Sequence, residues 1–322
     1  MKKSIFQLAA IPIIIGMLII NCLLPTISQA QYSNLHTFTG YVNGDGGSPY
    51  GSLLSIGSNL YGMTAYNGTN NLGTIFKVTT SGTYTTIFNF AGGTTCGEVP
   101  LGSLIYDGTY LYGMTDGGGS STVCAGGCGT IFKIKPDGTN YSIIYNFANN
   151  TTSGSEPSGD LIYDGTTTYL YGMTYGGGAH SLGTVFKIQS NGLNYSDLHD
   201  FAGGTSDGSM PEGSLLADNT FANLYGMTSG GGSSTVCSGG CGTIFKITPS
   251  ATYTTIFNFA GGTSGGSEPL GSLIADGTFA NLYGMTYGGG SSTVCSGGCG
   301  TIFKITPSAT YTTIFNFAGG TT

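Results

Sequence analysis

The chain has 322 residues, of which 59 are glycine, 21 tyrosine and 17 phenylalanine, while only 7% are charged and none is tryptophan. Disordered chains are poor in aromatic residues, and collagen has glycine at every third position, so both classes are excluded. A net charge of -7, with eight lysines and no arginine, also excludes nucleic acid and anionic membranes as partners. We expect a folded, glycine-punctuated all-β protein.

The N-terminal segment has the order of a secretory signal peptide. Lys2 and Lys3 precede an apolar run from Leu8 to Pro25, and small and polar residues lead to Ala30. We predict a signal peptide at 1–30, cleaved after Ala30, and a secreted or cell-surface protein that does not contact the membrane once the signal is removed. The alternatives are an uncleaved N-terminal membrane anchor and lipoprotein processing at Cys22.

One sequence unit occurs five times in the remainder of the chain. Each copy contains Leu-Tyr-Gly-Met-Thr, then Gly-Thr-Ile/Val-Phe-Lys, then an aromatic run that ends in phenylalanine. The Leu-Tyr-Gly-Met-Thr motifs start at Leu60, Leu111, Leu170, Leu224 and Leu282. Spacing of this regularity indicates a repeat architecture. We predict a single repeat domain at 31–322 whose units span about 49–90, 100–147, 157–201, 211–259 and 269–317.

Each unit has four runs of strand length, rich in Ile, Phe, Tyr and Thr and separated by Gly, Asn, Asp and Ser. Four short strands per repeat, with apolar residues on both faces, predict a β-propeller of four-stranded antiparallel blades. Leu35–Phe38 resembles the closing strand of a repeat, so we expect a leading strand at 35–38. We expect a closed five-bladed ring; the alternatives are an open arc of a larger propeller and a stacked β-sandwich array.

The repeat motif resembles a known bacterial family. Pro-x-Gly-Ser-Leu-Ile-x-Asp-Gly, Leu-Tyr-Gly-Met-Thr and Gly-Thr-Ile-Phe-Lys-Ile, in this order, resemble the GloVer tandem repeat over about Leu35 to Thr322. The first two strands are also similar to NHL repeats. The resemblance implies a propeller-like, exported bacterial protein with variable anchoring and no established activity. Methionine stands at Met63 and its four counterparts, where the family often has a small polar residue.

Loop lengths point to one candidate binding face. In an up-and-down blade the long second-to-third loops and the inter-repeat loops emerge on the same side, and binding residues are common in such loops. The candidate ligand-face residues, at the ends of the Leu-Tyr-Gly-Met-Thr strands, are Tyr66, Asp116, Tyr175, Ser229 and Tyr287. Tyrosines beside glycine-rich backbone suit an uncharged glycan, which stacks on aromatic rings. Uncommitted, solvated spacers are the alternative.

Six cysteines form three Cys-x-x-x-Cys pairs, and exported chains meet an oxidising compartment. We expect three local disulfides, Cys124 with Cys128, Cys237 with Cys241 and Cys295 with Cys299, and a free thiol at Cys96. Zinc is the weaker alternative, because each pair would need two further ligands and the chain has only three histidines.

No catalytic or metal site is expected, because nearly every polar residue recurs with the repeat and no unique constellation stands out. His180 and His199 are the off-pattern exceptions, and no partner is evident for either. We expect no cofactor; calcium between acidic loops is the alternative. The sequence favours a monomeric, non-catalytic module that binds or adheres to glycan or protein. A purely structural surface repeat is the alternative, and a secreted enzyme is less favoured.

Overall fold

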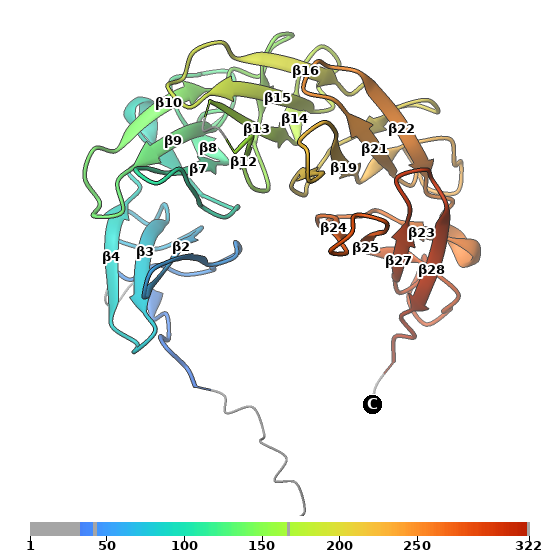
Figure 1. Ribbon diagram of the computed structural model, residues 1–322, viewed down its shortest axis with the longest axis horizontal. Coiled ribbons are helices and arrows are strands. Elements are labelled where there is room, and N and C mark those ends of the chain that lie inside the picture. The colour runs from blue at the N-terminus through green and yellow to red at the C-terminus, as the bar shows by residue number, and fades with distance from the viewer. Residues whose placement is uncertain (1–32, 41–43, 166–167, 321–322) are drawn as a thin grey trace, which may run out of the picture. The chain divides into compact units, whose positions relative to one another are not determined.

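Five four-stranded antiparallel sheets make up the fold in the computed structural model, which describes residues 33–40, 44–165 and 168–320 (Figure 1). The chain divides into two units, Met1–Asn34 and Leu35–Thr322, and all five sheets belong to the second. The predicted all-β fold of four-stranded blades is therefore confirmed. The predicted signal peptide lies outside the described residues. Within the described ranges, no helix is long and apolar enough to cross a membrane.

Each sheet takes its strands from one sequence repeat, and they pair in the order in which they occur in the chain. Sheet 1 contains β1 (Leu54–Ile56), β2 (Asn59–Thr64), β3 (Thr74–Thr79) and β4 (Tyr84–Asn89). Sheet 2 contains β6 (Ile105–Tyr106), β7 (Leu111–Thr115), β9 (Thr130–Ile134) and β10 (Ser142–Asn146). Sheet 3 contains β12 (Ile162–Tyr163), β13 (Tyr169–Thr174), β15 (Thr184–Gln189) and β16 (Ser196–Asp200). Sheet 4 contains β18 (Leu216–Ala217), β19 (Leu224–Thr228), β21 (Thr243–Ile247) and β22 (Tyr253–Asn258). Sheet 5 contains β24 (Ile274–Ala275), β25 (Leu282–Thr286), β27 (Thr301–Ile305) and β28 (Tyr311–Asn316).

The two central strands of each sheet fit together through a glycine and a threonine. In sheet 2, Gly113 lies opposite Phe132, and a Cβ on Gly113 would come within 2.7 Å of the phenylalanine ring. The glycine therefore leaves room for the ring between the sheets. At the end of the same strand pair, the buried Thr115 and Thr130 hydroxyls lie 2.8 Å apart and share a hydrogen bond. The recurring Leu-Tyr-Gly-Met-Thr and Gly-Thr-Ile-Phe-Lys motifs encode this pairing.

Short two-stranded ladders bring the inter-repeat loops and the second-to-third loops to the same side, as the sequence predicts. The ladders pair β5 (Gly97–Glu98) with β8 (Gly117–Gly118), β11 (Gly154–Ser155) with β14 (Gly176–Gly177), β17 (Gly208–Ser209) with β20 (Gly230–Gly231), and β23 (Gly266–Ser267) with β26 (Gly288–Gly289). Two 3-10 turns, η2 (Gly93–Thr95) and η3 (Gly262–Ser264), lie in the inter-repeat loops. These loops therefore form a continuous layer over one edge of the sheets.

The residue before each repeat's proline adopts a left-handed backbone and links two sheets. Val99 has φ 54°, which is uncommon for a β-branched residue. Its amide donates to the Leu72 carbonyl of the preceding repeat at 3.0 Å, and its carbonyl accepts from the Asp116 amide of its own repeat at 3.0 Å. The same conformation recurs at the other four pre-proline positions, Ser48, Glu156, Met210 and Glu268. Hydrogen bonds to both sides hold this conformation in place.

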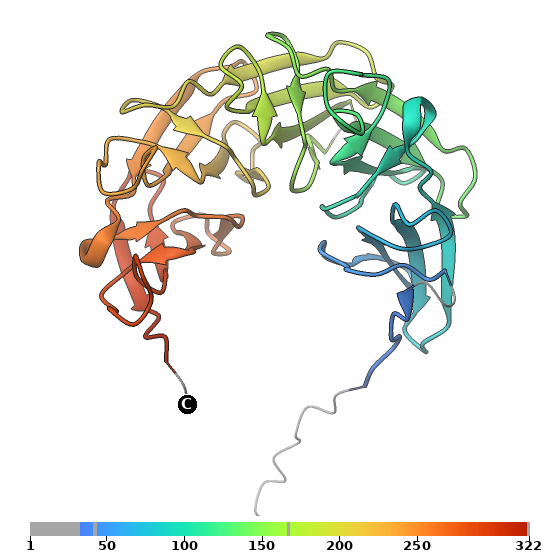
Figure 2. The ribbon, with the colours of Figure 1, turned by 180° about the vertical axis from the view of Figure 1, so that it is seen from behind.

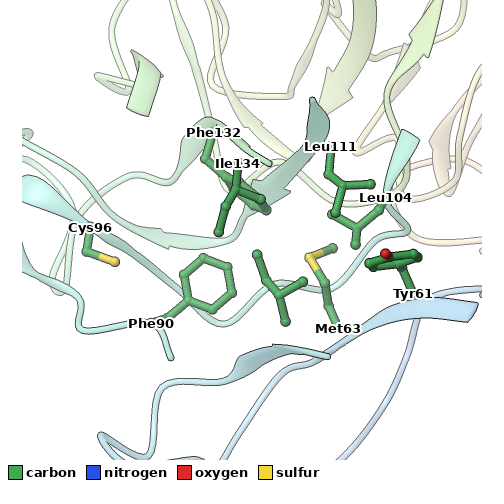
Figure 3. Close-up of a cluster of buried hydrophobic side chains, with 9 residues drawn as sticks. Tyr61, Met63, Phe90, Cys96, Leu104, Leu111, Phe132 and Ile134 are labelled. Atoms are coloured by element: carbon green, nitrogen blue, oxygen red, sulfur yellow. The ribbon is translucent and has the colours of Figure 1, made fainter. Parts of the chain in front are cut away.

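The hydrophobic core lies between consecutive sheets. Four clusters join sheets 1 and 2, 2 and 3, 3 and 4, and 4 and 5. Figure 3 shows the first, where Met63 and Phe90 of the first repeat meet Leu104, Leu111 and Ile134 of the second. Figure 2 shows the same order of sheets from behind. Each sheet between the first and the last therefore buries one face against the sheet before it and the other against the sheet after it.

The five sheets do not close into a ring. Within Leu35–Thr322 they follow an open arc, and among the described residues no hydrophobic cluster joins sheet 5 to sheet 1 (Figures 1 and 2). The expectation of a closed five-bladed ring was wrong. Curvature depends on the angle between successive sheets, which no local motif reveals. The open arc, the alternative from the sequence, describes this unit.

Leu35–Phe38 forms no strand, contrary to the prediction. The closing strand of each repeat pairs with a third strand of its own sheet, and no described third strand precedes residue 35. Side-chain contacts hold the segment instead. The His36 ring stacks on Tyr84 at 3.8 Å, and Phe38 meets Phe76 edge-on at 5.2 Å, so both rings lie against sheet 1.

Candidate functional site

A pocket lies along the inner edge of the sheets. It has a volume of about 730 Å³ and is lined by the turn that leads into the first strand of every repeat. We call these the Gly-Ser turns: Gly51–Ser52, Gly102–Ser103, Gly159–Asp160, Gly213–Ser214 and Gly271–Ser272. All five repeats therefore contribute to one cavity, which we call the inner pocket.

A row of hydrogen bonds holds the Gly-Ser turns together. The Ser52 amide donates to Ser103 Oγ at 2.8 Å, and the Ser103 amide donates to the Asp160 carboxylate at 2.6 Å. The Asp160 amide donates to Ser214 Oγ, and the Ser214 amide to Ser272 Oγ, both at 2.8 Å. Each turn thus contacts the next, which gives the pocket a polar wall fixed by backbone.

The turns also approach one another too closely for larger residues. A Cβ on Gly102 would lie 2.0 Å from the Gly159 carbonyl oxygen, and a Cβ on Gly213 would lie 2.2 Å from that of Gly271. Glycine at this position therefore allows the sheets to approach at the pocket wall.

Three of the five predicted ligand-face residues, Tyr66, Asp116 and Tyr175, line the inner pocket. Tyr66 is 45% exposed, so part of its ring is open to a ligand. Four further aromatic or acidic groups that the sequence analysis missed also line it: Tyr50, Glu156, Asp160 and Glu212. Tyr50, Glu156 and Glu212 each lie beside a proline of the inter-repeat loop, a signal that could have identified them.

The other two predicted residues lie elsewhere. Ser229 is buried, and its hydroxyl donates to the Met210 carbonyl at 2.8 Å. Tyr287 lines a second cavity, on sheet 5, which shares Leu270, Gly271 and Ser272 with the inner pocket. Tyr66 is also not the register counterpart of Asp116: the Ala65 amide donates to the Ser48 carbonyl, as the Asp116 amide does to Val99, so Tyr66 stands one residue further along.

The inner pocket is acidic, and burial raises the pKa of Asp116 and Glu212, two of its carboxyl groups. Its described lining includes Asp116, Glu156, Asp160 and Glu212 but no lysine. Burial, together with the negative charges of Glu156 and Glu98, raises the pKa of Asp116 to about 6. Burial also raises the pKa of Glu212. A buried acid with a raised pKa can donate a hydrogen bond near neutral pH, which an ordinary aspartate cannot.

The described residues contain no group of three or more His, Cys, Asp or Glu side chains arranged to hold a metal ion. A carboxyl group in the inner pocket can accept a hydrogen bond, or donate one when protonated.

Comparison with known proteins identifies the repeat. The sequence pattern described as the Gloeobacter/Verrucomicrobia repeat matches residues 120–322. The chain belongs to this repeat family. The match begins in the second-to-third loop of the second repeat, and the same motifs continue upstream through Leu60. No curated protein matches the chain.

Solved structures similar to this member of the Gloeobacter/Verrucomicrobia repeat family support its fold alone. A chain of a nidogen/laminin complex has a TM-score of 0.51 at 13% identity, covering 84% of this chain and 80% of that one. A protein assigned as a 6-phosphogluconolactonase from Bacteroides uniformis has a TM-score of 0.52 at 13% identity, covering 84% and 72%. Both agree with a propeller-like arrangement of four-stranded sheets.

The second, fourth and fifth Gloeobacter/Verrucomicrobia repeats each carry a disulfide in the second-to-third loop. Cys124–Cys128, Cys237–Cys241 and Cys295–Cys299 are bonded, as the sequence predicts. A Cβ on Gly261 would lie 2.5 Å from Cys241 Sγ, so the bridge packs against the following inter-repeat loop. The disulfides thus fix the second-to-third loops within the loop layer.

Cys96 occupies a position at which a side chain anchors the inter-repeat loops before the second, third and fourth Gloeobacter/Verrucomicrobia repeats. The buried Cys96 Sγ accepts from the Ala91 amide at 3.3 Å, and Ser153 Oγ accepts from the Ala148 amide at 3.2 Å. Asp207 accepts from the Ala202 amide at 2.8 Å. A thiol, a hydroxyl and a carboxylate each close the loop from this position, whereas the equivalent residue before the fifth repeat is Gly265.

His199, an off-pattern residue, has a structural role at the same anchor. Its Nε2 lies 3.0 Å from the Asp207 carboxylate, and its ring stacks on Tyr253 of the next sheet at 3.6 Å. Burial raises the pKa of Asp207, but hydrogen bonds from His199 and the Ala202 amide outweigh it, and that pKa lies below its ordinary value. Asp45 and His36 repeat this arrangement at 3.1 Å before sheet 1.

Proposed function

We propose that the chain is an exported, non-catalytic binding module whose inner pocket takes an uncharged glycan. The observation that carries this proposal is the convergence of Tyr66, Tyr175 and Asp116 on one cavity. Tyrosine rings offer apolar faces on which sugars stack, and the polar wall of Gly-Ser turns offers hydrogen-bonding groups at fixed positions. Rigid elements that carry such groups are typical of binding sites.

The charge of the pocket supports an uncharged ligand. Four carboxyl groups line it and the chain carries a net charge of -7, so an anionic ligand would be repelled. Binding through stacking and neutral hydrogen bonds should also be insensitive to salt.

Three disulfides in the described chain support export, because such bonds persist mainly in oxidising compartments. This agrees with the signal peptide expected at 1–30, after whose removal the protein would be secreted or held at the cell surface.

A glycan array on the purified protein, followed by calorimetric titration of any hit, tests the ligand class. We expect Tyr66→Ala with Tyr175→Ala to weaken binding by about tenfold or more, since two stacking contacts are lost. Tyr287→Ala is the matched control, because this exposed tyrosine lies outside the inner pocket. Equal loss in the control, or no loss in the double variant, would place the ligand elsewhere.

The pH dependence of binding gives a second test of the same site. A ligand that covers Asp116 removes water from its carboxyl, which is easier when the group is protonated. Because the pKa of Asp116 is about 6, affinity should fall as the pH rises through this value. Asp116→Asn should remove most of the fall. An affinity that is flat with pH in the parent would exclude Asp116 from contact.

The structural alternative makes the opposite prediction. A purely structural surface repeat would show no glycan or protein ligand in array and pull-down screens, and the tyrosine variants would behave as the parent does.

A secreted enzyme would release products from a glycan hit on prolonged incubation, and Asp116→Asn would abolish that release.

A further inference from the structure

Sheet 5 exposes a face that is covered in the other four sheets. Met285 and Phe315 are 59% and 51% exposed. The counterpart of Met285 in sheet 4, Met227, is 2% exposed and packs in the cluster between sheets 4 and 5. A cavity of about 560 Å³ lies on the open face, lined by Ile274, Met285, Phe317 and nearby residues. We call this the end face.

Along β27 and β28, the end face has the same sequence as the face of sheet 4 that is buried against sheet 5. Ser291 to Thr321 is identical to Ser233 to Thr263, so β27 and β28 carry the same residues as β21 and β22. In the fourth repeat Phe257 stacks on Tyr311 of the next sheet at 4.1 Å, and Phe259 meets Phe303 at 5.3 Å. Phe315 and Phe317 are the equivalent residues on the end face. They can pack against a further sheet in the same way.

The inner edge of sheet 5 is also open. A Cβ on any of the four preceding Gly-Ser turn glycines would fall within 2.5 Å of the next turn, whereas nothing lies within 4 Å of a Cβ on Gly271. Similarly, Pro100 packs against Gly73 of the preceding repeat. The equivalent of Gly73 in the fifth repeat is Gly300, which has no proline among its nearest neighbours.

Sheet 1 carries the complementary surface. Leu53 is 52% exposed, whereas its counterpart Leu104 is 3% exposed at the interface with the preceding sheet. Tyr84 and Phe76 hold the positions of Tyr311 and Phe303, the two rings that receive a closing strand. In this structure they receive His36 and Phe38 instead.

We propose that the end face binds sheet 1 of a second copy of this chain, head to tail. Phe315 and Phe317 of one copy would take the places of His36 and Phe38 against sheet 1 of the other, and the Ser272 amide would donate to Ser52 Oγ. We infer a second copy as the occupant because four interfaces between consecutive sheets inside the chain already pair these two kinds of face. Sheet 5 exposes one of the two faces, and sheet 1 carries the other. The monomer expected from the sequence then applies only to dilute chain.

The segment Leu35–Phe38 limits this association. It imitates a closing strand with its histidine and phenylalanine, and it must leave sheet 1 before the end face of another copy can dock. Association is therefore an exchange of one pair of aromatic contacts for another, which keeps the chain from assembling at low concentration.

Sedimentation velocity from about 1 µM to about 1 mM measures the association. We expect concentration-dependent growth in mass. Met285→Glu should weaken it by at least about tenfold, because a charge would be buried without a partner. Gly271→Ala should also weaken it while leaving folding intact. Val294→Glu is the matched control, since this valine of the same repeat is 66% exposed and its counterpart Val236 remains 67% exposed beside sheet 5.

Release of the N-terminal segment gives the opposite effect. Phe38→Ala should strengthen association by about fivefold or more, because it weakens the competing contact. A single monomeric species for Phe38→Ala throughout the range would overturn the proposal. So would association that Met285→Glu leaves unchanged.

Thiol crosslinking identifies the surfaces in contact. In a Cys96→Ser background, Leu53→Cys in one chain and Met285→Cys in another should give a crosslinked pair with a short bismaleimide when the two are mixed. Neither chain alone should do so. Efficient intramolecular crosslinking in a chain that carries both substitutions, at high dilution, would show that sheet 1 closes onto its own end face and would overturn the proposal.

Discussion

The fourth and fifth repeats share a stretch of identical sequence but differ in burial. Phe259 is fully buried and Phe317, its equivalent, is 37% exposed. Ile244 is fully buried, and Ile302 is only partly so. The local strand pairing is the same in both sheets. Secondary structure in this protein is therefore encoded within a repeat, whereas burial is supplied by the neighbouring repeat, as in quasi-one-dimensional arrays.

The largest difference between the fourth and fifth repeats is expected for two equivalent core truncations. Phe259→Ala should destabilise the chain by about 3 to 4 kcal/mol, since it leaves a cavity between two sheets. Phe317→Ala, in the same local sequence, should cost about 1 kcal/mol or less because its ring is already partly exposed. Urea unfolding followed by circular dichroism measures both. Equal losses in dilute protein would mean that the end face is covered.

The disulfides give the next test. Removing any one of the three bridges should lower stability by about 2 kcal/mol through the unfolded-state entropy of a short loop. Replacing Cys237 and Cys241 with serine should cost more than the same change at Cys295 and Cys299, because Cys241 is fully buried in the core between sheets 4 and 5. Intact mass should first show the parent six hydrogens lighter than its reduced form, with Cys96 alkylatable after unfolding. Free thiols at all six loop cysteines would contradict the bridges.

The Gly-Ser turns of the fourth and fifth repeats also differ in whether a following turn packs against them. Gly213→Ala should destabilise by about 1 to 2 kcal/mol, because its Cβ would lie 2.2 Å from the Gly271 carbonyl oxygen and force the sheets apart. Gly271→Ala meets nothing within 4 Å and should be neutral or slightly stabilising in dilute solution. Thermal unfolding at low concentration separates the two. A similar loss for both would show that the turn itself, and not its neighbour, requires glycine.

The smallest expected effect on stability concerns the anchor of the inter-repeat loop. This position is Asp207 before the fourth repeat and Gly265 before the fifth. Asp207→Asn should cost about 1 kcal/mol at neutral pH, through weaker hydrogen bonds with His199 and the Ala202 amide. Because the pKa of Asp207 is lowered in the folded state, its contribution is present above the ordinary aspartate pKa and is lost as the pH falls through the lowered value. Parent and variant should therefore converge in acid. A difference that persists at acid pH would assign the effect to shape and not to charge.

The sequence predicted those features that a single repeat contains. Four strands per unit, the Cys-x-x-x-Cys bridges and the gathering of long loops on one side all follow from motifs that lie within one repeat. Tyr66, Asp116 and Tyr175 were found through this loop argument, and they share the inner pocket.

Features that depend on two or more repeats could not be predicted. Closure depends on small rotations between sheets, and Leu35–Phe38 lacks a described partner strand although its residues match a closing strand. Ser229 is buried because its hydroxyl reaches the Met210 carbonyl across the loop layer, and Tyr287 is separated from the inner pocket because it lies on the end face. Side-chain direction at a strand end is set by these contacts, which the alternation of residues does not specify.

The row of hydrogen bonds along the Gly-Ser turns has a direction. From Ser52 to Ser272, every amide donor belongs to the earlier repeat and every side-chain acceptor to the later one. The two ends of the row are therefore chemically different: the Ser52 end offers a hydroxyl oxygen and the Ser272 end offers an amide. A twofold-symmetric contact through this edge would set like groups against like. The row of hydrogen bonds at the inner edge therefore runs in one direction. Only a neighbour placed head to tail can extend the row.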